Sequence, residues 1–165
     1  MAEKISKLDY AISSSVDPAR PLANAFDGNT DTLWGTVETD TIADISFIGQ
    51  DFPQEVTISR FRLRNAFATY FPTILRVKQF NGTWKTVQDF AVTTTLEWKD
   101  LVLDVPLVTS KVAVFAGSNL SGGSAFAVSE FEVYGYRLGF MPEPKQISLP
   151  VILSTMPAAL TRGFR

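Results

Sequence analysis

The feature of this sequence that most restricts its fold is the lack of a helical stripe, because no window of about 11 or more residues repeats apolar side chains at helical spacing. Apolar residues recur at every second position instead, in short runs. Phe61 to Arg64 alternates cleanly between an apolar and a cationic face, and the alternation returns in Leu101 to Val105 and in Val112 to Ala116. Several short strands of this kind, separated by turns, predict an all-β sandwich or barrel.

Turn signals between the runs indicate how the strands connect. Ile74 to Phe80 and Thr83 to Val87 flank Asn81-Gly82, which is the strongest short-range signal for a β-hairpin. Two further runs, Ile42 to Ile48 and Val56 to Ser59, alternate in part, and a change of frame between Ile58 and Phe61 predicts a β-bulge or a change of face. The predicted core consists of Ile45, Phe47, Ile58, Phe61, Leu63, Val77, Trp84, Leu103, Val112, Val114, Phe131 and Val133.

The composition of the chain excludes several classes of function. The 165 residues are 45% apolar and 19% charged, which suits one packed domain with a tail. A net charge of -2 argues against nucleic-acid binding. The chain contains neither Cys nor His, which excludes thiol nucleophiles, His-dependent catalysis and zinc sites built from those residues.

Targeting and membrane signals are missing from the sequence. The opening decapeptide has two Lys but no apolar stretch behind them, as a secretory signal would require. The most apolar late segment, Ile147 to Leu160, is interrupted by Pro150 and Pro157 and is shorter than the roughly 20 residues that span a bilayer. We therefore expect a soluble protein that is made in a cytoplasm and does not insert into a membrane.

Composition changes after Tyr136. Residues 137–165 contain four of the nine Pro and carry a net charge of +3. This segment is nevertheless far more apolar than a disordered linker. We divide the chain into a domain over 1–136 and an irregular C-terminal arm over 137–165, which either folds back over its own domain or docks on another subunit. The apolar residues of the arm are Leu138, Phe140, Met141, Ile147, Leu149, Val151, Ile152, Leu153, Met156, Leu160 and Phe164.

The segment from Asn24 to Trp34 contains the most informative polar pattern. Asp27, Asn29 and Thr32 place three oxygen-bearing side chains within six residues, and Gly28 permits a tight loop. A hard cation such as Ca²⁺ takes six to eight oxygen ligands, so a second carboxylate must come from elsewhere, and Glu130 is a candidate. From the residues alone, a simple Asp-Gly-Asn turn and a cation-binding loop both remain open.

Two motifs make the chain resemble a known family. AFDGNTDTLW at residues 25–34, followed about 95 residues later by VSEFEVYG at 128–135, resembles the discoidin or coagulation-factor C-type family, which overlaps the galactose-binding-like carbohydrate-binding modules. NGTW at 81–84 is similar to the family's Asp-Gly-x-Trp hairpin. The resemblance covers residues 9 to 136 and implies a jelly-roll β-sandwich of about eight antiparallel strands.

The resemblance also implies one structural calcium ion, held between the first loop and the last strand. The ion would staple the loop and take no part in catalysis, and Trp34 would pack beneath the loop as part of the core. Carried over to this sequence, the metal ligands would be the carbonyl of Asn24, the side chains of Asp27 and Asn29, the hydroxyl or carbonyl of Thr32, the carbonyl of Ser129 and the carboxylate of Glu130.

Family members bind glycans through loops at one end of the sandwich. Aromatic rings suit the apolar face of a sugar, and Arg or amide groups suit its hydroxyls. The predicted ligand-binding residues are Arg64, Asn65, Phe67 and Tyr70 in the loop 64–71, and Phe126 after a second loop. As an alternative, Phe67 or Phe71 plugs the end of the sandwich. The sequence lacks the His of many galactose binders, and it lacks the disulfide of the blood-factor members, so their binding to membrane lipids is not implied.

Three functions follow from these observations. We expect a non-catalytic binding or structural module of a bacteriophage virion, in the capsid or tail, that recognises cell-surface glycans. Such proteins are made in the host cytoplasm without a signal peptide, and the arm would contact other virion subunits in an oligomer or larger assembly. The alternative is a carbohydrate-binding module of a glycan-active enzyme. An enzyme in its own right is the third, but no spacing among the 17 carboxylates supports a glycosidase pair.

Overall fold

The computed structural model describes residues 2–37, 43–67, 71–118 and 125–137. Its eight strands are joined into one antiparallel hydrogen-bonded sheet, and two 3-10 turns, η1 (Leu8–Tyr10) and η2 (Leu22–Ala25), lie near the N-terminus. In this part of the chain no helix is long and apolar enough to cross a membrane. The strands are β1 (Glu3–Lys4), β2 (Ala11–Ser13), β3 (Trp34–Gly35), β4 (Phe47–Asn65), β5 (Ile74–Phe80), β6 (Trp84–Ala91), β7 (Trp98–Ala116) and β8 (Ala127–Arg137).

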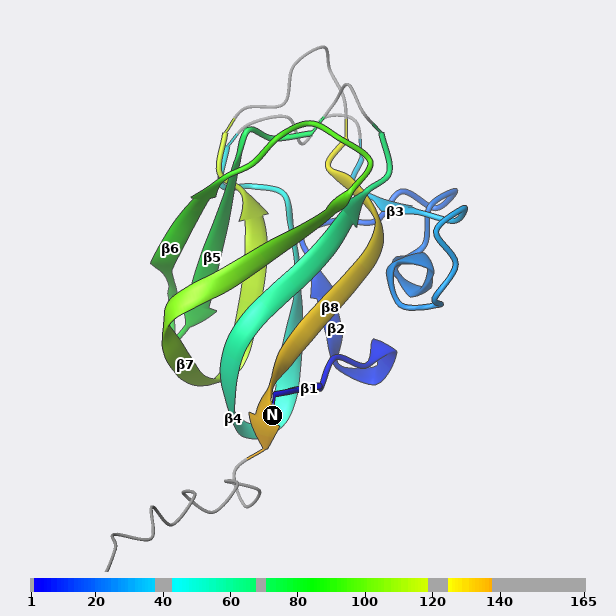
Figure 1. Ribbon diagram of the computed structural model, residues 1–165. Coiled ribbons are helices and arrows are strands. Elements are labelled where there is room, and N and C mark those ends of the chain that lie inside the picture. Colours follow the sequence, from blue (N-terminus) through cyan, green and yellow to red (C-terminus); the bar gives the residue numbers. More distant parts are fainter. Residues whose placement is uncertain (1, 38–42, 68–70, 119–124, 138–165) are drawn as a thin grey trace, which may run out of the picture.

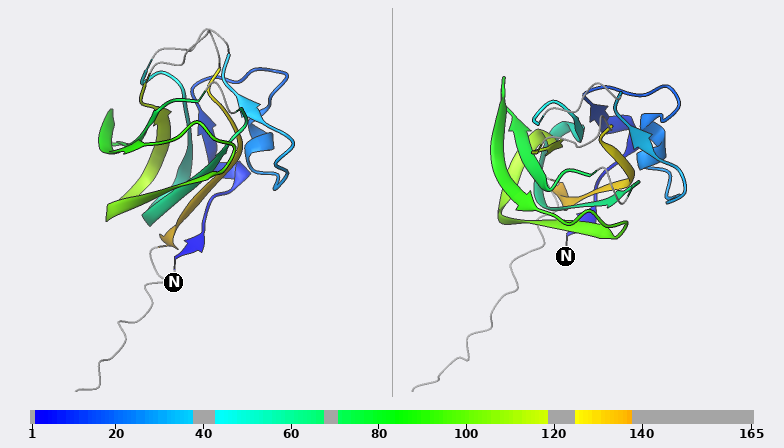
Figure 2. Two further views of the ribbon diagram at one scale, coloured as in Figure 1. Left: turned by 45° about the horizontal axis from the view of Figure 1, so that its top comes forward. Right: turned by 90° about the horizontal axis from the view of Figure 1, so that it is seen from above.

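The long strands β4 and β7 fold this sheet into two layers. Each has 19 residues, and their mutual pairing is shifted between Asp51 and Val56 and again between Ile58 and Arg60. The first half of β4 pairs with β2 and its second half with β8, while the second half of β7 pairs with β5. One layer therefore contains β1, β3 and β8, the other contains β2, β5 and β6, and β4 and β7 contribute to both (Figures 1 and 2).

Local signals in the sequence placed the turns and the bulge correctly. The shift between Ile58 and Arg60 occurs in the ladders with both β7 and β8, which confirms the predicted bulge. At the β5–β6 hairpin, Phe80 pairs with Trp84 across a three-residue loop, and Gly82 has the positive φ of 80° that such loops require. Strand β5 coincides with the predicted run 74–80, and the two predicted runs 101–105 and 112–116 lie in the single long strand β7, so the all-β prediction is confirmed.

Nine of the twelve predicted core residues are buried. Ile45 is wrong, because it lies in the turn before β4 and is 44% exposed. Phe47 and Trp84 are only half-buried and pack together with their ring centroids 5.3 Å apart, on the face that alternates with the inward-pointing Ile48. The sequence indicated the alternation correctly, but the residues that face inward differ by one position from those predicted.

The two ends of the sandwich differ. β4 and β6 end, and β5 and β8 begin, at the upper end in Figure 1, whereas the N-terminus and the end of β8 lie at the lower end. Trp34 in β3 pairs with Val128 near the start of β8 and is fully buried, with its ring centroid 5.7 Å from that of Phe126, which confirms its core position. Phe71 is 6% exposed, so it closes this end as the alternative interpretation held. We call this the loop end.

Candidate cation and ligand sites

The Asp27–Thr32 segment forms a compact loop held by its own polar side chains. Asp27 Oδ1 accepts from the Asn29 amide at 2.8 Å, and Asp27 Oδ2 accepts from the Thr32 hydroxyl at 2.7 Å. Asn29 Oδ1 accepts from the Asp31 amide at 3.1 Å, and Gly28 has a φ of +75°. The hydrogen bond from Thr32 lowers the pKa of the Asp27 carboxyl, so this carboxylate is charged at neutral pH.

Glu130 supplies the second carboxylate from the middle of β8. The residue is 2% exposed, and its Oε1 atom is buried with no hydrogen-bond partner. Burial, followed by the negative charge of Asp27, raises the pKa of Glu130 above its ordinary value. Among the described residues no Lys or Arg lies within ion-pair distance of Glu130. A buried carboxylate oxygen without a partner is costly, and a bound cation would remove that cost.

The oxygen atoms of these residues suit a hard cation, but only two of the groups, Asp27 and Glu130, are carboxylates. No cluster of three or more Asp, Glu, His or Cys that could hold a metal occurs in the part of the chain that the structure describes. Asp27 and Glu130 would therefore need neutral oxygens to complete a calcium site. Thr32 Oγ1 lies within hydrogen-bond distance of Asp27, and Ser129 precedes Glu130 directly, so both predicted residues lie beside the carboxylates.

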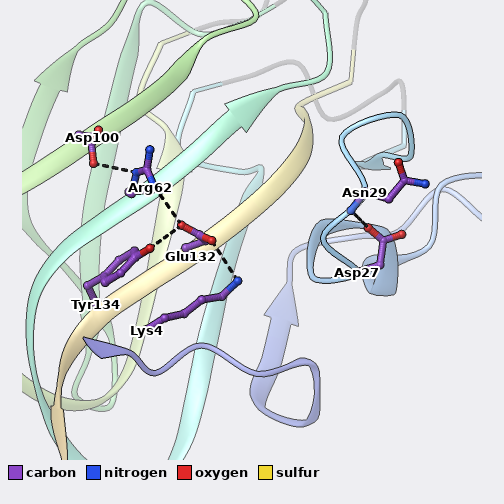
Figure 3. A network of polar contacts seen from close by, with 7 residues as sticks. All are labelled: Lys4, Asp27, Asn29, Arg62, Asp100, Glu132 and Tyr134. Carbon is purple, nitrogen blue, oxygen red and sulfur yellow. Dashed lines mark hydrogen bonds and ion pairs between the residues drawn. The ribbon is translucent and has the colours of Figure 1, made fainter. Parts of the chain in front are cut away.

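The remaining predicted metal ligands stabilise the loop in this structure. The side-chain amide of Asn24, at the end of η2, donates to the carbonyl of Leu33 at 3.0 Å and so closes the base of the loop. The side-chain oxygen of Asn29 is directed back to the Asp31 amide. Both contacts fix the shape of the loop that carries Asp27 and Asn29 (Figure 3).

The predicted ligand-binding residues are not brought together. Arg64 is half-buried, and its guanidinium contacts Thr30 and Ser129. Asn65 and Phe126 are fully buried, so in this structure neither offers a surface to a sugar. Phe67 is 37% exposed just beyond the end of β4, at the loop end. Tyr70 lies outside the described residues.

The sequence did not predict two cationic side chains that lie at the loop end. The guanidinium carbon of Arg20, from the loop before η2, lies 5.7 Å from the ring centroid of Phe67. Nothing in the local sequence indicates this contact, because it depends on the path of two loops. Lys99 is 8% exposed and donates to the hydroxyls of Thr93 and Thr95. Its burial could have been predicted, since Lys99 is in phase with the inward-facing Leu101 and Leu103.

A network of ion pairs covers the outer face of β4, β7 and β8 below the loop. Glu132 Oε1 accepts from Lys4 Nζ at 3.0 Å, and Glu132 Oε2 accepts from the Tyr134 hydroxyl at 2.8 Å (Figure 3). Arg62 lies 3.6 Å from Glu132 and 3.0 Å from Asp100. Each carboxylate in this network has a cationic partner, in contrast to Glu130.

Comparison with known proteins settles the fold. No protein-family model and no curated protein sequence matches this chain. Among solved structures, the family 32 carbohydrate-binding module of Clostridium perfringens NanJ, in complex with galactose, superposes with a TM-score of 0.68 and 18% identity. The match covers 81% of this chain and 99% of that module. This chain has the discoidin-like, galactose-binding-like jelly-roll fold.

Other structures with this discoidin-like fold agree. Chitosan-binding module 1 of a Paenibacillus sp. IK-5 chitosanase/glucanase matches with a TM-score of 0.65 and 20% identity, over 82% of this chain and 100% of the module. An F5/8 type C domain from Bacteroides fragilis matches with a TM-score of 0.65 and 14% identity, over 82% of this chain and 97% of the domain. The predicted jelly roll is confirmed, and at these identities the comparisons show the fold alone.

Proposed function

We propose that this protein is a non-catalytic glycan-binding module whose ligand binds at the loop end, against Phe67. The observation that supports this proposal is the pairing of an exposed aromatic ring with a cation in a fold shared with carbohydrate-binding modules. The guanidinium of Arg20 lies over the Phe67 ring, and the exposed part of that ring would receive the apolar face of the sugar. Arg20 also pairs with Asp17 at 3.5 Å, which restricts its position. Preorganised side chains of this kind lose little freedom on binding.

Glycan binding can be tested with galactose and chitotriose, the ligands of structural neighbours. We expect Phe67→Ala to weaken binding of the preferred glycan by up to about tenfold, since an aromatic contact is worth about 0.5–1.5 kcal/mol. Phe80→Ala is a matched control. Phe80, on the β5–β6 hairpin, is also 37% exposed, and it also lies near a cationic side chain, that of Lys111. Equal loss in both variants, measured by calorimetry, would contradict the placement, and absence of binding across a glycan array would contradict the function.

We further propose that Asp27 and Glu130 hold a structural calcium ion with neutral oxygens of the loop and of Ser129. Support comes from the unpartnered buried Oε1 of Glu130 facing a second carboxylate. The ion would tie the Asp27–Thr32 loop to β8, and Thr32 and Asp27 would keep their mutual orientation for it. When bound, calcium supplies positive charge to two adjacent carboxylates.

Calcium should stabilise the folded protein by about 2.7 kcal/mol at a concentration one hundred times its Kd. Asp27→Ala should abolish this gain, as measured by thermal unfolding with calcium and with a chelator. Asp31→Ala is the matched control, because Asp31 belongs to the same loop but contributes its amide to Asn29. Identical melting curves of the wild-type protein with and without calcium would remove the proposed ion.

Assembly into a virus particle remains a separate proposal. It is supported by the composition of residues 138–165, whose large apolar side chains need to be covered by protein. Those residues lie outside the described part of the chain. Mass spectrometry of purified particles, with the number of copies per particle, would decide between a virion component and a module of a glycan-active enzyme.

A further inference from the structure

Arg64 occupies an unusual position in the β4–β8 ladder. It lies directly opposite Glu130, and facing side chains on paired strands are about 5 Å apart at Cβ. An Arg in this position would ordinarily pair with the buried carboxylate. Instead, Arg64 Nη1 donates to the carbonyl of Thr30 at 3.1 Å and to Ser129 Oγ at 3.3 Å. The arrangement leaves Glu130 Oε1 without a partner.

The contacts of Arg64 join the loop to the sheet. The hydrogen bonds of Asp27, Asn29 and Thr32 are internal to the loop, so they fix its shape but not its place. The Arg64 guanidinium connects Thr30, in that loop, to Ser129, next to Glu130. The Ser129 hydroxyl also lies 3.4 Å from the carbonyl of Arg64, which makes the contact reciprocal.

Arg64 also stands at the start of the candidate glycan-binding segment. It is the penultimate residue of β4, and Phe67 follows three residues later. The Ala66 amide donates to the carbonyl of Ala127, so this segment is itself anchored on β8. A shift of the Asp27–Thr32 loop relative to β8 would therefore move Arg64, and with it the backbone of the residues that lead to Phe67.

We propose that Arg64 is a positioning residue that holds the Asp27–Thr32 loop against β8 and links cation binding there to the order of residues 64–67. This role rests on the proposed cation site, and it replaces the direct contact with sugar expected from the sequence. Because coupling between two binding sites is reciprocal, the cation and a glycan at Phe67 would each raise the affinity for the other by the same factor.

Calcium alone is the probe for this proposal. We expect Arg64→Met to raise the calcium concentration at half-saturation about tenfold in a thermal-shift titration. In the wild-type protein, calcium should slow amide hydrogen exchange in residues 27–32 and also in residues 64–67, and Arg64→Met should abolish the second effect. Arg64→Lys, which keeps the charge but has a shorter reach, should fall between the two. Arg60→Met is the matched control, since Arg60 is on the same strand and stacks on Tyr134.

The outcomes separate the proposals. A wild-type calcium midpoint and wild-type exchange in Arg64→Met would overturn the positioning role while the cation site stands. Absence of any calcium response in the wild-type protein would overturn both. Glycan arrays without binding, together with the expected calcium results, would overturn the glycan function and leave the role of Arg64 supported. If Arg64→Met fails to fold, the midpoint of Arg64→Lys decides the question in the same way.

Discussion

Glu130 and Glu132 lie two residues apart on β8, near the same outer face, and differ in how they are partnered. Both are largely buried, with Glu130 2% exposed as a residue and the Glu132 side chain 14% exposed. Burial raises the pKa of Glu132, but the hydrogen bonds from Lys4 and Tyr134 and the charge of Arg62 outweigh it, so that its pKa is lowered. For Glu130, burial and Asp27 act in the same direction and its pKa is raised.

This contrast shows that burial alone does not determine the state of a carboxylate. Glu132 satisfies its oxygens with groups of the protein, and such a network contributes to stability. Glu130 lies next to another carboxylate, with an Arg across the ladder that is engaged elsewhere. A carboxylate kept in this way destabilises the metal-free protein, as is typical of binding sites. The contrast assigns Glu132 to the polar network of the sheet, and Glu130 is the carboxylate that we propose binds the cation.

The largest expected effect comes from Glu132→Gln. The substitution places an amide against Lys4, Tyr134 or Arg62 and leaves at least one half-buried donor without an acceptor, which we expect to cost about 2 kcal/mol at neutral pH. Because the folded-state pKa of Glu132 is lowered, its contribution is present above the unfolded-state value and is lost as the pH falls through the folded-state value.

Urea unfolding at pH 7 and at pH 3 measures this effect. The cost of Glu132→Gln should be larger at pH 7 than at pH 3, because the stability contributed by the ionised carboxylate falls with the pH. Glu55→Gln, at an exposed position in β4, is the control and should change stability by less than about 0.5 kcal/mol. A cost for Glu132→Gln no larger than that of the control would show that the network contributes nothing measurable.

The opposite sign is expected for Glu130→Gln, with a smaller magnitude than for Glu132→Gln. Without calcium, the neutral amide removes a buried charge beside Asp27, so the variant should be more stable than the wild-type protein at pH 7. A raised pKa means that the stability contributed by protonated Glu130 is fully present below its unfolded-state value of about 4.5 and is lost as the pH rises through the folded-state value. The advantage of the variant should therefore disappear near pH 4.

Calcium should reverse the order of these two proteins. The wild-type protein would gain stability from the ion and Glu130→Gln would gain little, because the amide supplies only one neutral oxygen. Chelator and calcium series at pH 7 test this reversal. A variant that is less stable than the wild-type protein in chelator would show that Glu130 has a partner in the metal-free protein, and the contrast with Glu132 would fail.

The sequence revealed the parts of the molecule that are specified locally. Alternation located the long strands β4, β5 and β7 but not the short strands β1, β2 and β3. Asn81-Gly82 located the hairpin and the frame change after Ile58 located the bulge, because each depends on adjacent residues. The loop around Asp27 was also recognisable, since its hydrogen bonds span only a few residues. Membership of the outer or inner face was less certain at the strand ends, where Ile45 was misassigned.

Contacts between distant loops could not be predicted in the same way. Arg64 was assigned to the ligand by its position in a motif, yet its guanidinium reaches Thr30, 34 residues away in the chain. The contact of Arg20 with Phe67 likewise joins two segments with no sequence pattern in common. Glu132 received no functional or structural role from the sequence, because its partners Lys4, Arg62 and Tyr134 come from three different strands.

The smallest expected effect comes from Lys4, the most exposed partner of Glu132. Lys4 donates to Glu132 but its side chain is 44% exposed, so Lys4→Met should cost only about 0.5 kcal/mol at low salt and less at 1 M salt, where the charges are screened. Lys4 also lowers the pKa of Glu130, so its removal should enlarge the stabilisation that Glu130→Gln brings in chelator. A double-mutant cycle of Lys4→Met with Glu130→Gln measures this, with Lys85→Met, at an exposed position of β6, as the control. Additive effects at low salt would show that the charge of Lys4 does not act on Glu130, so that Lys4 partners Glu132 alone.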